Sequence, residues 1–363
     1  MEKTNLNAVV EIGPILSKAE TLEYSQRSYI KGISFFALNL ILYLSAVSGA
    51  ILLQSDFLQF ICSLLAALFT ALLFIVGHDA CHQSLTPSRR LNYWLGQISF
   101  LPSLHPFSLW DLGHNRIHHR FTNLKTRDYV WTPLSLSEYQ QLSTPRRLLY
   151  RYYRSVFGPT IYYLVLWKRK MFLPPAKEID GYRTEYVRDT MIVCAYLITV
   201  TAALLGFPIM FNSSLVKGQW IWWEPVIYAL CIPFLMWNVL MAFVIYLHHT
   251  HPGIVWFKDN TDWDAKRTQL ECTVHVIFPG PINFIFHRIM EHTAHHVRPS
   301  IPLYHLKEAQ ERLEELYGER IVNLKWSIKN HLDVVTRCKL YDYDNYCWLD
   351  FSGKPTTASK GYP

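Results

Sequence analysis

The chain has 363 residues, of which 50% are hydrophobic and 17% charged, and its formal net charge is +7 at pH 7. Its seven cysteines are scattered, without a Cys-x-x-C pair, which argues against a disulfide framework and against an iron–sulfur module. We expect an integral, multi-pass membrane protein, because the apolar residues gather in long runs. We expect no nucleic-acid partner.

Four long apolar runs predict four membrane-spanning helices. A helix crosses the bilayer core with about 20 apolar residues. No charged residue separates Lys31 from Asp56 or Asp56 from Asp79, which predicts a helical hairpin that turns near Asp56. The runs from Thr190 to Val216 and from Pro225 to Leu247 predict a second hairpin.

The distribution of Lys and Arg predicts the orientation in the membrane. The connection between the two hairpins, residues 83–186, is rich in both, whereas the loop at 211–218 is short and has Lys217 as its only cation. Cytoplasmic loops carry the excess of positive charge. We therefore expect both termini, the long connection and the histidine clusters on the cytosolic face.

The remaining segments predict one domain with a cap of shorter helices. Residues 91–107 and 271–286 are apolar but contain prolines, and we expect them to lie at the membrane interface. The expected fold is all-α and integral to the membrane, with four transmembrane helices in two hairpins and a cytosolic helical cap. The expected parts are a cytosolic N-terminal segment (1–30), one domain (31–351) and a flexible tail (352–363).

Three histidine clusters are the strongest chemical signal. They are His78 and His82; His114, His118 and His119; and His292, His295 and His296. Residues three or four apart share a helix face, so His114 and His118 are expected to point the same way, with His119 able to reach a second metal. The third cluster is expected to form one tight patch. A catalytic zinc usually takes three protein ligands, so eight imidazoles suit a pair of transition metals instead.

The residue types of the candidate ligands indicate which kind of metal centre to expect. Soluble di-iron helix bundles use Glu and Glu-x-x-His ligands, and this chain has histidines in their place. Nitrogen ligands at a membrane surface suggest an oxygen-activating di-iron centre that acts on a lipid or hydrocarbon.

The clusters read H-x-x-x-H, H-x-x-x-H-H and H-x-x-H-H, and their order around two predicted hairpins resembles the membrane fatty acid desaturase family. The resemblance covers about Gly77 to Phe351. The acyl-lipid omega-6 (delta-12-type) branch is most similar, through Pro106-Phe107 and Trp110 before the second cluster. The sequence departs from that branch at His248, where a glutamine is common.

The resemblance implies a set of site residues. The implied iron ligands are His78, His82, His114, His118, His119, His292, His295 and His296, with a further ligand at His249 or His287 and His251 in reserve. Candidates for hydrogen bonds that orient the ligand rings are Asp79, Asp111, Asp128 and Glu291.

The implied activity is oxygen-dependent desaturation of a fatty acyl chain, introducing a cis double bond with two Fe²⁺ ions and molecular oxygen as co-substrate. Electrons must come from an external donor, ferredoxin or cytochrome b5, because the chain has no His-Pro-Gly-Gly haem motif and no flavin or nicotinamide fingerprint. A lipid or carotenoid hydroxylase or ketolase with the same di-iron site is one alternative. A zinc-dependent membrane hydrolase is a remote alternative. Such a protein is expected to have three metal-binding histidines and seven spans, whereas this chain has more clustered histidines and four predicted spans.

Overall fold

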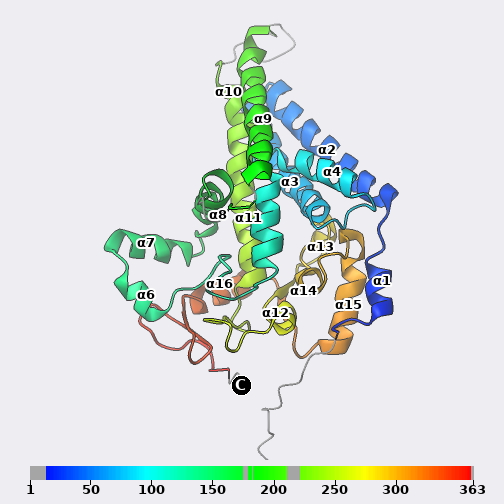
Figure 1. Cartoon of the computed structure of the whole chain (residues 1–363). Coiled ribbons are helices and arrows are strands. Elements are labelled where there is room, and N and C mark those ends of the chain that lie inside the picture. Colours follow the sequence, from blue (N-terminus) through cyan, green and yellow to red (C-terminus); the bar gives the residue numbers. More distant parts are fainter. Residues whose placement is uncertain (1–13, 175–178, 182, 211–220, 361–363) are drawn as a thin grey trace, which may run out of the picture.

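The computed structural model describes residues 14–174, 179–181, 183–210 and 221–360. Long helices rise from one end of the molecule, and shorter helices and loops form a broad cap at the other end (Figure 1). Four helices are long and apolar enough to cross a membrane: α2 (Tyr29–Leu52), α3 (Asp56–Cys81), α9 (Arg183–Met210) and a continuous helix over Glu224–His249. The four predicted spans therefore coincide with four apolar helices.

Helices α2 and α3 lie along each other and are joined by a short turn. Helix α2 ends at Leu52 and α3 begins at Asp56, where the Ser55 hydroxyl accepts a hydrogen bond from the backbone of Leu58. Gly49 permits the close approach, because a Cβ there would lie 2.7 Å from the Cys62 sulfur. The turn near Asp56 is thus where the charge pattern predicted it.

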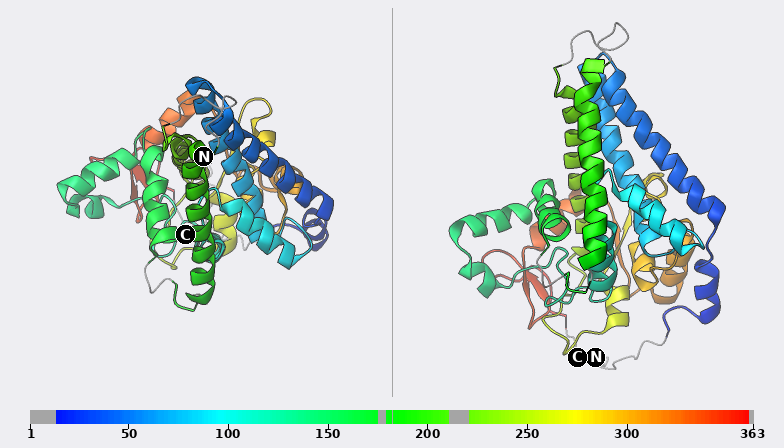
Figure 2. Two further views of the ribbon diagram at one scale, coloured as in Figure 1. Left: turned by 90° about the horizontal axis from the view of Figure 1, so that it is seen from above. Right: turned by 45° about the horizontal axis from the view of Figure 1, so that its top comes forward.

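The fourth long helix changes its winding near its start. Its segments are α10 (Glu224–Val226), the π-helix η4 (Ile227–Cys231) and α11 (Ile232–His249). Pro233 lies just after the π-helical turn, and it cannot donate a backbone hydrogen bond to that turn. Helix α11 packs against α3 and α8, and Figure 2 shows the long helices extending together away from the cap.

Helix α9 is fixed at the end that lies nearer the cap. The buried Asp189 carboxylate accepts hydrogen bonds from the backbone N–H of Ser108 at 2.9 Å and from the Tyr93 hydroxyl at 3.1 Å. At its other end α9 meets α10. The predicted connection over 211–218, with Lys217, lies outside the described residues.

The cap consists of short helices. They are α1 (Lys18–Tyr24), α4 (Arg89–Phe100), α5 (Phe107–Trp110), the π-helix η1 (Asp111–His118), α6 (Leu136–Gln141), α7 (Thr144–Tyr153), α8 (Pro159–Trp167), the π-helix η2 (Lys168–Phe172), α12 (Ala265–Glu271), α13 (Ile282–Ile285), α14 (His292–Val297), the 3₁₀-helix η5 (Leu303–His305), α15 (Leu306–Tyr317) and α16 (Ile328–Arg337).

Four short strands correct the all-α expectation, although the fold is mostly helical. Strand β1 (Val274–Ile277) pairs in parallel with β2 (Val322–Lys325), and β3 (Leu340–Asp342) pairs antiparallel with β4 (Cys347–Leu349). Strand β1 falls in the segment that was expected to lie at the membrane interface. Its β-branched residues favour a strand, and its side chains are largely buried in the cap.

The predicted flexible tail folds back on the cap as far as residue 360. The backbone N–H of Thr356 donates to the Trp348 carbonyl at 2.8 Å, and the Trp348 N–H donates to the Thr357 hydroxyl at 2.9 Å. These contacts extend the small β3–β4 sheet. The limits of the three predicted parts of the chain stay a prediction.

Candidate metal centre

The second histidine cluster lies on a π-helix, and this decides how its rings are directed. In η1 the backbone N–H of His119 donates to the carbonyl of His114 at 2.9 Å, five residues earlier. Residues five apart are therefore in register. His114 and His119 face the same way, and His118 faces a different group of histidines. The expectation that His114 and His118 point the same way is confirmed, because their rings stack with centroids 5.5 Å apart and both line one cavity, although the two rings belong to different groups.

Five histidines converge in the first group. They are His78, His82, His114, His119 and His295, from the ends of α3 and η1 and from α14. The Nε2 atom of His114 lies 2.8 Å from that of His78 and 3.0 Å from that of His119. The Nε2 atoms of His119 and His295 are also 3.0 Å apart.

Four histidines converge in the second group. They are His118, His249, His292 and His296, all of them buried. The Nε2 atom of His249 lies 3.1 Å from that of His118 and 3.0 Å from that of His292. The rings of the third sequence cluster lie within 5.8 Å of one another and so form the one patch that was expected. This patch serves both groups, because His292 and His296 are one helical turn apart on α14 while His295 faces the first group.

The geometry of both groups fits a transition metal. A histidine nitrogen lies about 2.1 Å from such an ion, so two ligands at right angles are about 3.0 Å apart. That is the separation of the paired Nε2 atoms. The Nδ1–H of His118 donates to Asp128, which leaves a lone pair on Nε2 that faces the second group. Lone pairs aimed at one another from several rings favour a cation between them.

Five histidines of the two groups, on η1 and α14 or directly after η1, are held neutral. Burial first, and the neighbouring histidines second, lower the pKa of His114, His119 and His295 well below the usual range. The same two causes lower the pKa of His292 and His296. Neutral imidazole is the form that binds a metal ion, so these rings are prepared as ligands.

Two of the four predicted orienting carboxylates contact histidines of the groups. The oxygens of Asp128 lie 3.0 and 3.1 Å from Nδ1 of His118. An oxygen of Asp79 lies 3.3 Å from Nδ1 of His78, and its other oxygen accepts from the backbone of Leu303 at 2.6 Å. Both carboxylates are buried, so they fix the tautomer and direction of the rings.

The other two carboxylates have different partners. Asp111 accepts from the Asn115 amide and from Arg116, each at 2.8 Å. Glu291 precedes α14 and accepts from Arg288 at 3.2 Å. No hydrogen bond of either to a grouped histidine occurs in the described residues.

Three histidines that the sequence analysis considered near the clusters lie outside the two groups. The Nε2 atom of His287 lies 3.1 Å from the Asn39 side-chain oxygen, and the Nδ1 atom of His251 accepts from the backbone of Gly253 at 2.9 Å. His248 stacks on His292, with ring centroids 3.7 Å apart. Of the extra candidates, His249 alone joins a group.

Two polar residues that were not among the predicted site residues hold the second group. The Gln269 side-chain oxygen lies 2.8 Å from Nδ1 of His296, and its amide donates to the His119 carbonyl. The Thr122 hydroxyl lies 3.3 Å from the same Nδ1. These contacts direct Nε2 of His296 to the group. A glutamine on a separate helix has no spacing signal, so the sequence did not reveal it.

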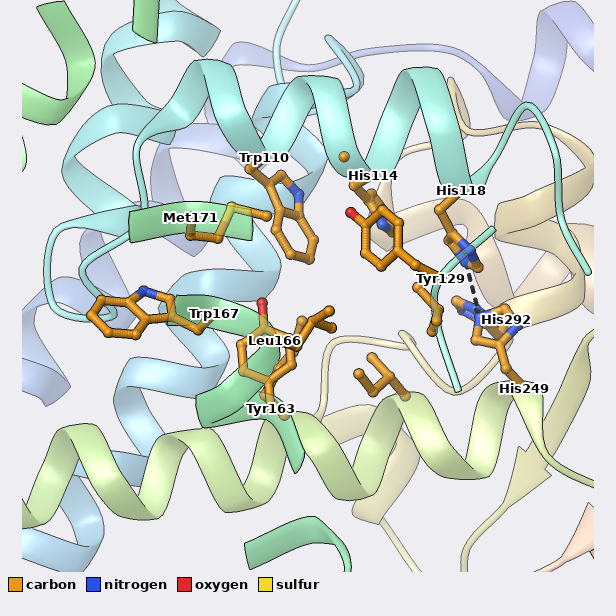
Figure 3. Close-up of a pocket in the computed structure, with 14 residues that line it drawn as sticks. Trp110, His114, His118, Tyr129, Tyr163, Leu166, Trp167, Met171, His249 and His292 are labelled. Carbon is orange, nitrogen blue, oxygen red and sulfur yellow. Dashed lines mark hydrogen bonds between the residues drawn. The ribbon is translucent and has the colours of Figure 1, made fainter. Parts of the chain in front are cut away.

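Two apolar cavities meet at the histidines. The smaller cavity, about 480 Å³, extends from His118 and His249 past Tyr163 to Trp167 (Figure 3). The larger cavity, about 620 Å³, lies between α3 and α11. Both are lined mainly by aromatic and aliphatic side chains, which is the lining expected for an apolar ligand.

Comparisons with known proteins agree with this site. The family model for fatty acid desaturases matches residues 56–327. The chloroplastic omega-6 fatty acid desaturase of Spinacia oleracea is 28% identical over 277 residues, which are 75% of this chain and 57% of that protein. The sn-1 oleoyl-lipid 12-desaturase of Picosynechococcus is 27% identical over 272 residues, which are 75% of this chain and 74% of that protein.

A third relative is the sn-1 acyl-lipid omega-3 desaturase (ferredoxin) of Synechocystis, 30% identical over 299 residues, which are 80% of this chain and 77% of that protein. The chain spans 57% to 59% of the length of the chloroplast relatives. The names of the first two relatives, an omega-6 fatty acid desaturase and an oleoyl-lipid 12-desaturase, confirm the predicted resemblance to the omega-6 branch. Because the family model matches well over half of the chain, this protein belongs to the fatty acid desaturase family.

Proposed function

We propose that this protein is a membrane-bound, oxygen-dependent desaturase that introduces a cis double bond of the delta-12 (omega-6) type into the fatty acyl chain of a lipid. The observation that carries the proposal is the position of two groups of buried and half-buried histidines where two apolar cavities meet. Relatives named as omega-6 and oleoyl-lipid 12-desaturases support the substrate class.

We assign one iron ion to each histidine group. The proposed ligands are His78, His82, His114, His119 and His295 for one ion, and His118, His249, His292 and His296 for the other. When bound, two ferrous ions supply the activation of molecular oxygen that removal of hydrogen from an unactivated methylene requires. His287 and His251 are left out of this set.

The protein residues around the histidines have their own tasks. Asp128 and Asp79 hold Nδ1 of His118 and His78, so that each Nε2 atom stays directed at its group. The apolar cavity walls exclude water and hold an acyl chain in place. Excluding water also protects a reactive centre from side reactions.

The orientation and the electron donor are part of the proposal. We infer that the histidine groups and both termini face the cytosol, because Lys and Arg are abundant between residues 83 and 186. The reaction needs two electrons from outside the chain. The relative whose name includes ferredoxin supports a ferredoxin as donor rather than cytochrome b5.

The test is expression in a host that makes oleate but no polyunsaturated lipid, with a ferredoxin and its reductase supplied. Gas chromatography–mass spectrometry of total lipids is expected to show a new diene derived from oleate. A hydroxylated acyl chain would show that the protein is a hydroxylase and not a desaturase. An unchanged lipid profile with the donor present would contradict the proposal.

A further inference from the structure

A buried histidine outside the metal groups lies at the centre of an aromatic cluster. His105 is fully buried, and its ring meets three aromatic rings edge-on. The distance between ring centroids is 5.2 Å to Phe74, 5.8 Å to Trp110 and 5.0 Å to Trp237. A polar ring at the centre of such a cluster needs a reason, because an unsatisfied polar group there is costly.

Hydrogen bonds satisfy both nitrogens of His105. Its Nδ1–H donates to the carbonyl of Ser103 at 2.7 Å, so its Nε2 accepts from the Tyr163 hydroxyl at 2.9 Å. Burial lowers the pKa of His105 to about 3, and the ring therefore stays neutral. The pair fixes the position and direction of the Tyr163 side chain.

The same loop also fixes a second residue of α8. The carbonyl of Leu104 accepts a hydrogen bond from the indole N–H of Trp167 at 3.0 Å. Leu104 has a positive φ of 56°, a strained conformation for a residue with a side chain. Residues 103–105 thus anchor both Tyr163 and Trp167, which line the smaller cavity in Figure 3.

The neighbours of His105 belong to both cavities, although His105 itself lines neither. Tyr163 lines the smaller cavity, Phe74 and Trp237 line the larger one, and Trp110 lines both. Trp110 also stacks on His114 of the first metal group, with ring centroids 4.6 Å apart. His105 is therefore packed behind the place where the two cavities meet.

The cavities share a strip of wall beside the metal groups. We call it the shared wall; it consists of Trp110, His114, Met241, Ile245 and His292. Met241 and Ile245 are one turn apart on α11, so they form one face of this strip. A chain that occupies both cavities must place its middle carbons against the shared wall, next to both histidine groups.

We propose that His105 and Tyr163 are positioning residues that hold the shared wall and the smaller cavity rigid, and that they thereby set which methylene carbons of the acyl chain face the metal groups. This inference rests on the proposed function, because it takes the acyl chain as the ligand of the two cavities. It adds a specificity role for two residues that contact neither the metals nor the reacting carbons.

The first experiment measures the position of the new double bond. Tyr163→Phe removes only the hydroxyl, and His105→Leu removes the hydrogen bonds to Tyr163 and to the Ser103 carbonyl. The double variant also removes the Tyr163 hydroxyl that His105→Leu alone would leave unpaired. A fixed apolar pocket separates chains that differ by one methylene by roughly 10- to 200-fold. Each variant is expected to lower the ratio of major to minor positional isomer about tenfold, with iron content per chain unchanged.

The control is His331→Leu. His331 is also buried and lies edge-on to aromatic rings, but it is on α16 and lines neither cavity. It is expected to keep the wild-type isomer ratio. If His105 and Tyr163 served stability alone, the double variant would recover yield and every variant would keep one isomer, which would overturn the inference.

A second experiment does not depend on turnover. Purified protein is irradiated with a phospholipid whose acyl chain carries a mid-chain diazirine, and labelled peptides are identified by mass spectrometry. The wild type is expected to be labelled on the shared wall, and Tyr163→Phe to spread the label to other cavity residues. Absence of label from the shared wall would overturn the inference, whereas label there without any unsaturated product would contradict the desaturase proposal alone.

Discussion

The sharpest perturbation of the proposed metal site is Asp128→Asn. The Asp128 side chain is 2% exposed and accepts hydrogen bonds from three donors. They are Nδ1 of His118, at 3.0 and 3.1 Å from its two oxygens, and the backbone N–H groups of Asn123 at 2.9 Å and Val130 at 3.1 Å. The substitution removes the negative charge and replaces one of the two carboxylate oxygens by an NH₂ group, while the shape of the side chain stays the same.

The size of the effect follows from these contacts. The asparagine has one oxygen and one NH₂ group, so at least one of the backbone donors, on Asn123 or Val130, loses its acceptor. A buried donor without a partner costs roughly 1–3 kcal/mol of folding stability. Losing the partner that orients a metal-binding histidine typically lowers metal affinity or activity by about 10- to 100-fold.

The assay is iron retention by the purified protein during titration with a chelator, together with a thermal unfolding curve. The matched control is Asp111→Asn, the same change near the same cluster, because Asp111 contacts Asn115 and Arg116 and no grouped histidine. We expect Asp128→Asn to lose iron at about a tenfold lower chelator concentration than the control. Equal retention in the two folded variants would refute the reasoning.

Four substitutions, in two pairs, test other parts of the account. In Gly113→Ala the new Cβ would lie 2.3 Å from the Tyr129 hydroxyl beside the smaller cavity, so turnover measured by product yield should fall, whereas Gly206→Ala, with open space around it, should keep activity. His287→Ala should retain the iron of the wild type, because its ring bonds to α2, whereas His292→Ala should lose about half of it in metal analysis. Loss of iron from the first variant, or full retention in the second, would count against the proposed ligand set.

Much of the fold could be predicted from the sequence, because hydropathy reports burial in lipid directly. The charge-free runs located the apolar helices and the turn before Asp56. The strand β1 was missed, because the segment 271–286 is short, apolar and interrupted by prolines. The sequence of such a segment is compatible both with a helix at the membrane interface and with a buried strand. The strand becomes evident only from its pairing with β2, which is distant in the sequence.

The sequence predicted which histidines lie close together but not how they divide into two groups. Helical spacing placed His114 and His118 side by side, as the structure does, but the π-helix η1 adds His119 to the group of His114 and leaves His118 in the other group. The sequence could not distinguish His249 from His287 as the extra ligand, because one ends the fourth apolar run and the other lies just before the third cluster. The choice depends on the folded structure, in which α11 places His249 in the second group and His287 bonds to Asn39.

The measurement that tests the central claim most directly is metal analysis of the purified wild-type protein after reconstitution under anaerobic conditions. Two histidine groups with separate ligands predict about two iron ions per chain, the content expected of a two-metal site. The account also predicts about one ion in His118→Ala and in His295→Ala, which belong to different groups. One tightly bound zinc and no iron in the wild type would contradict it.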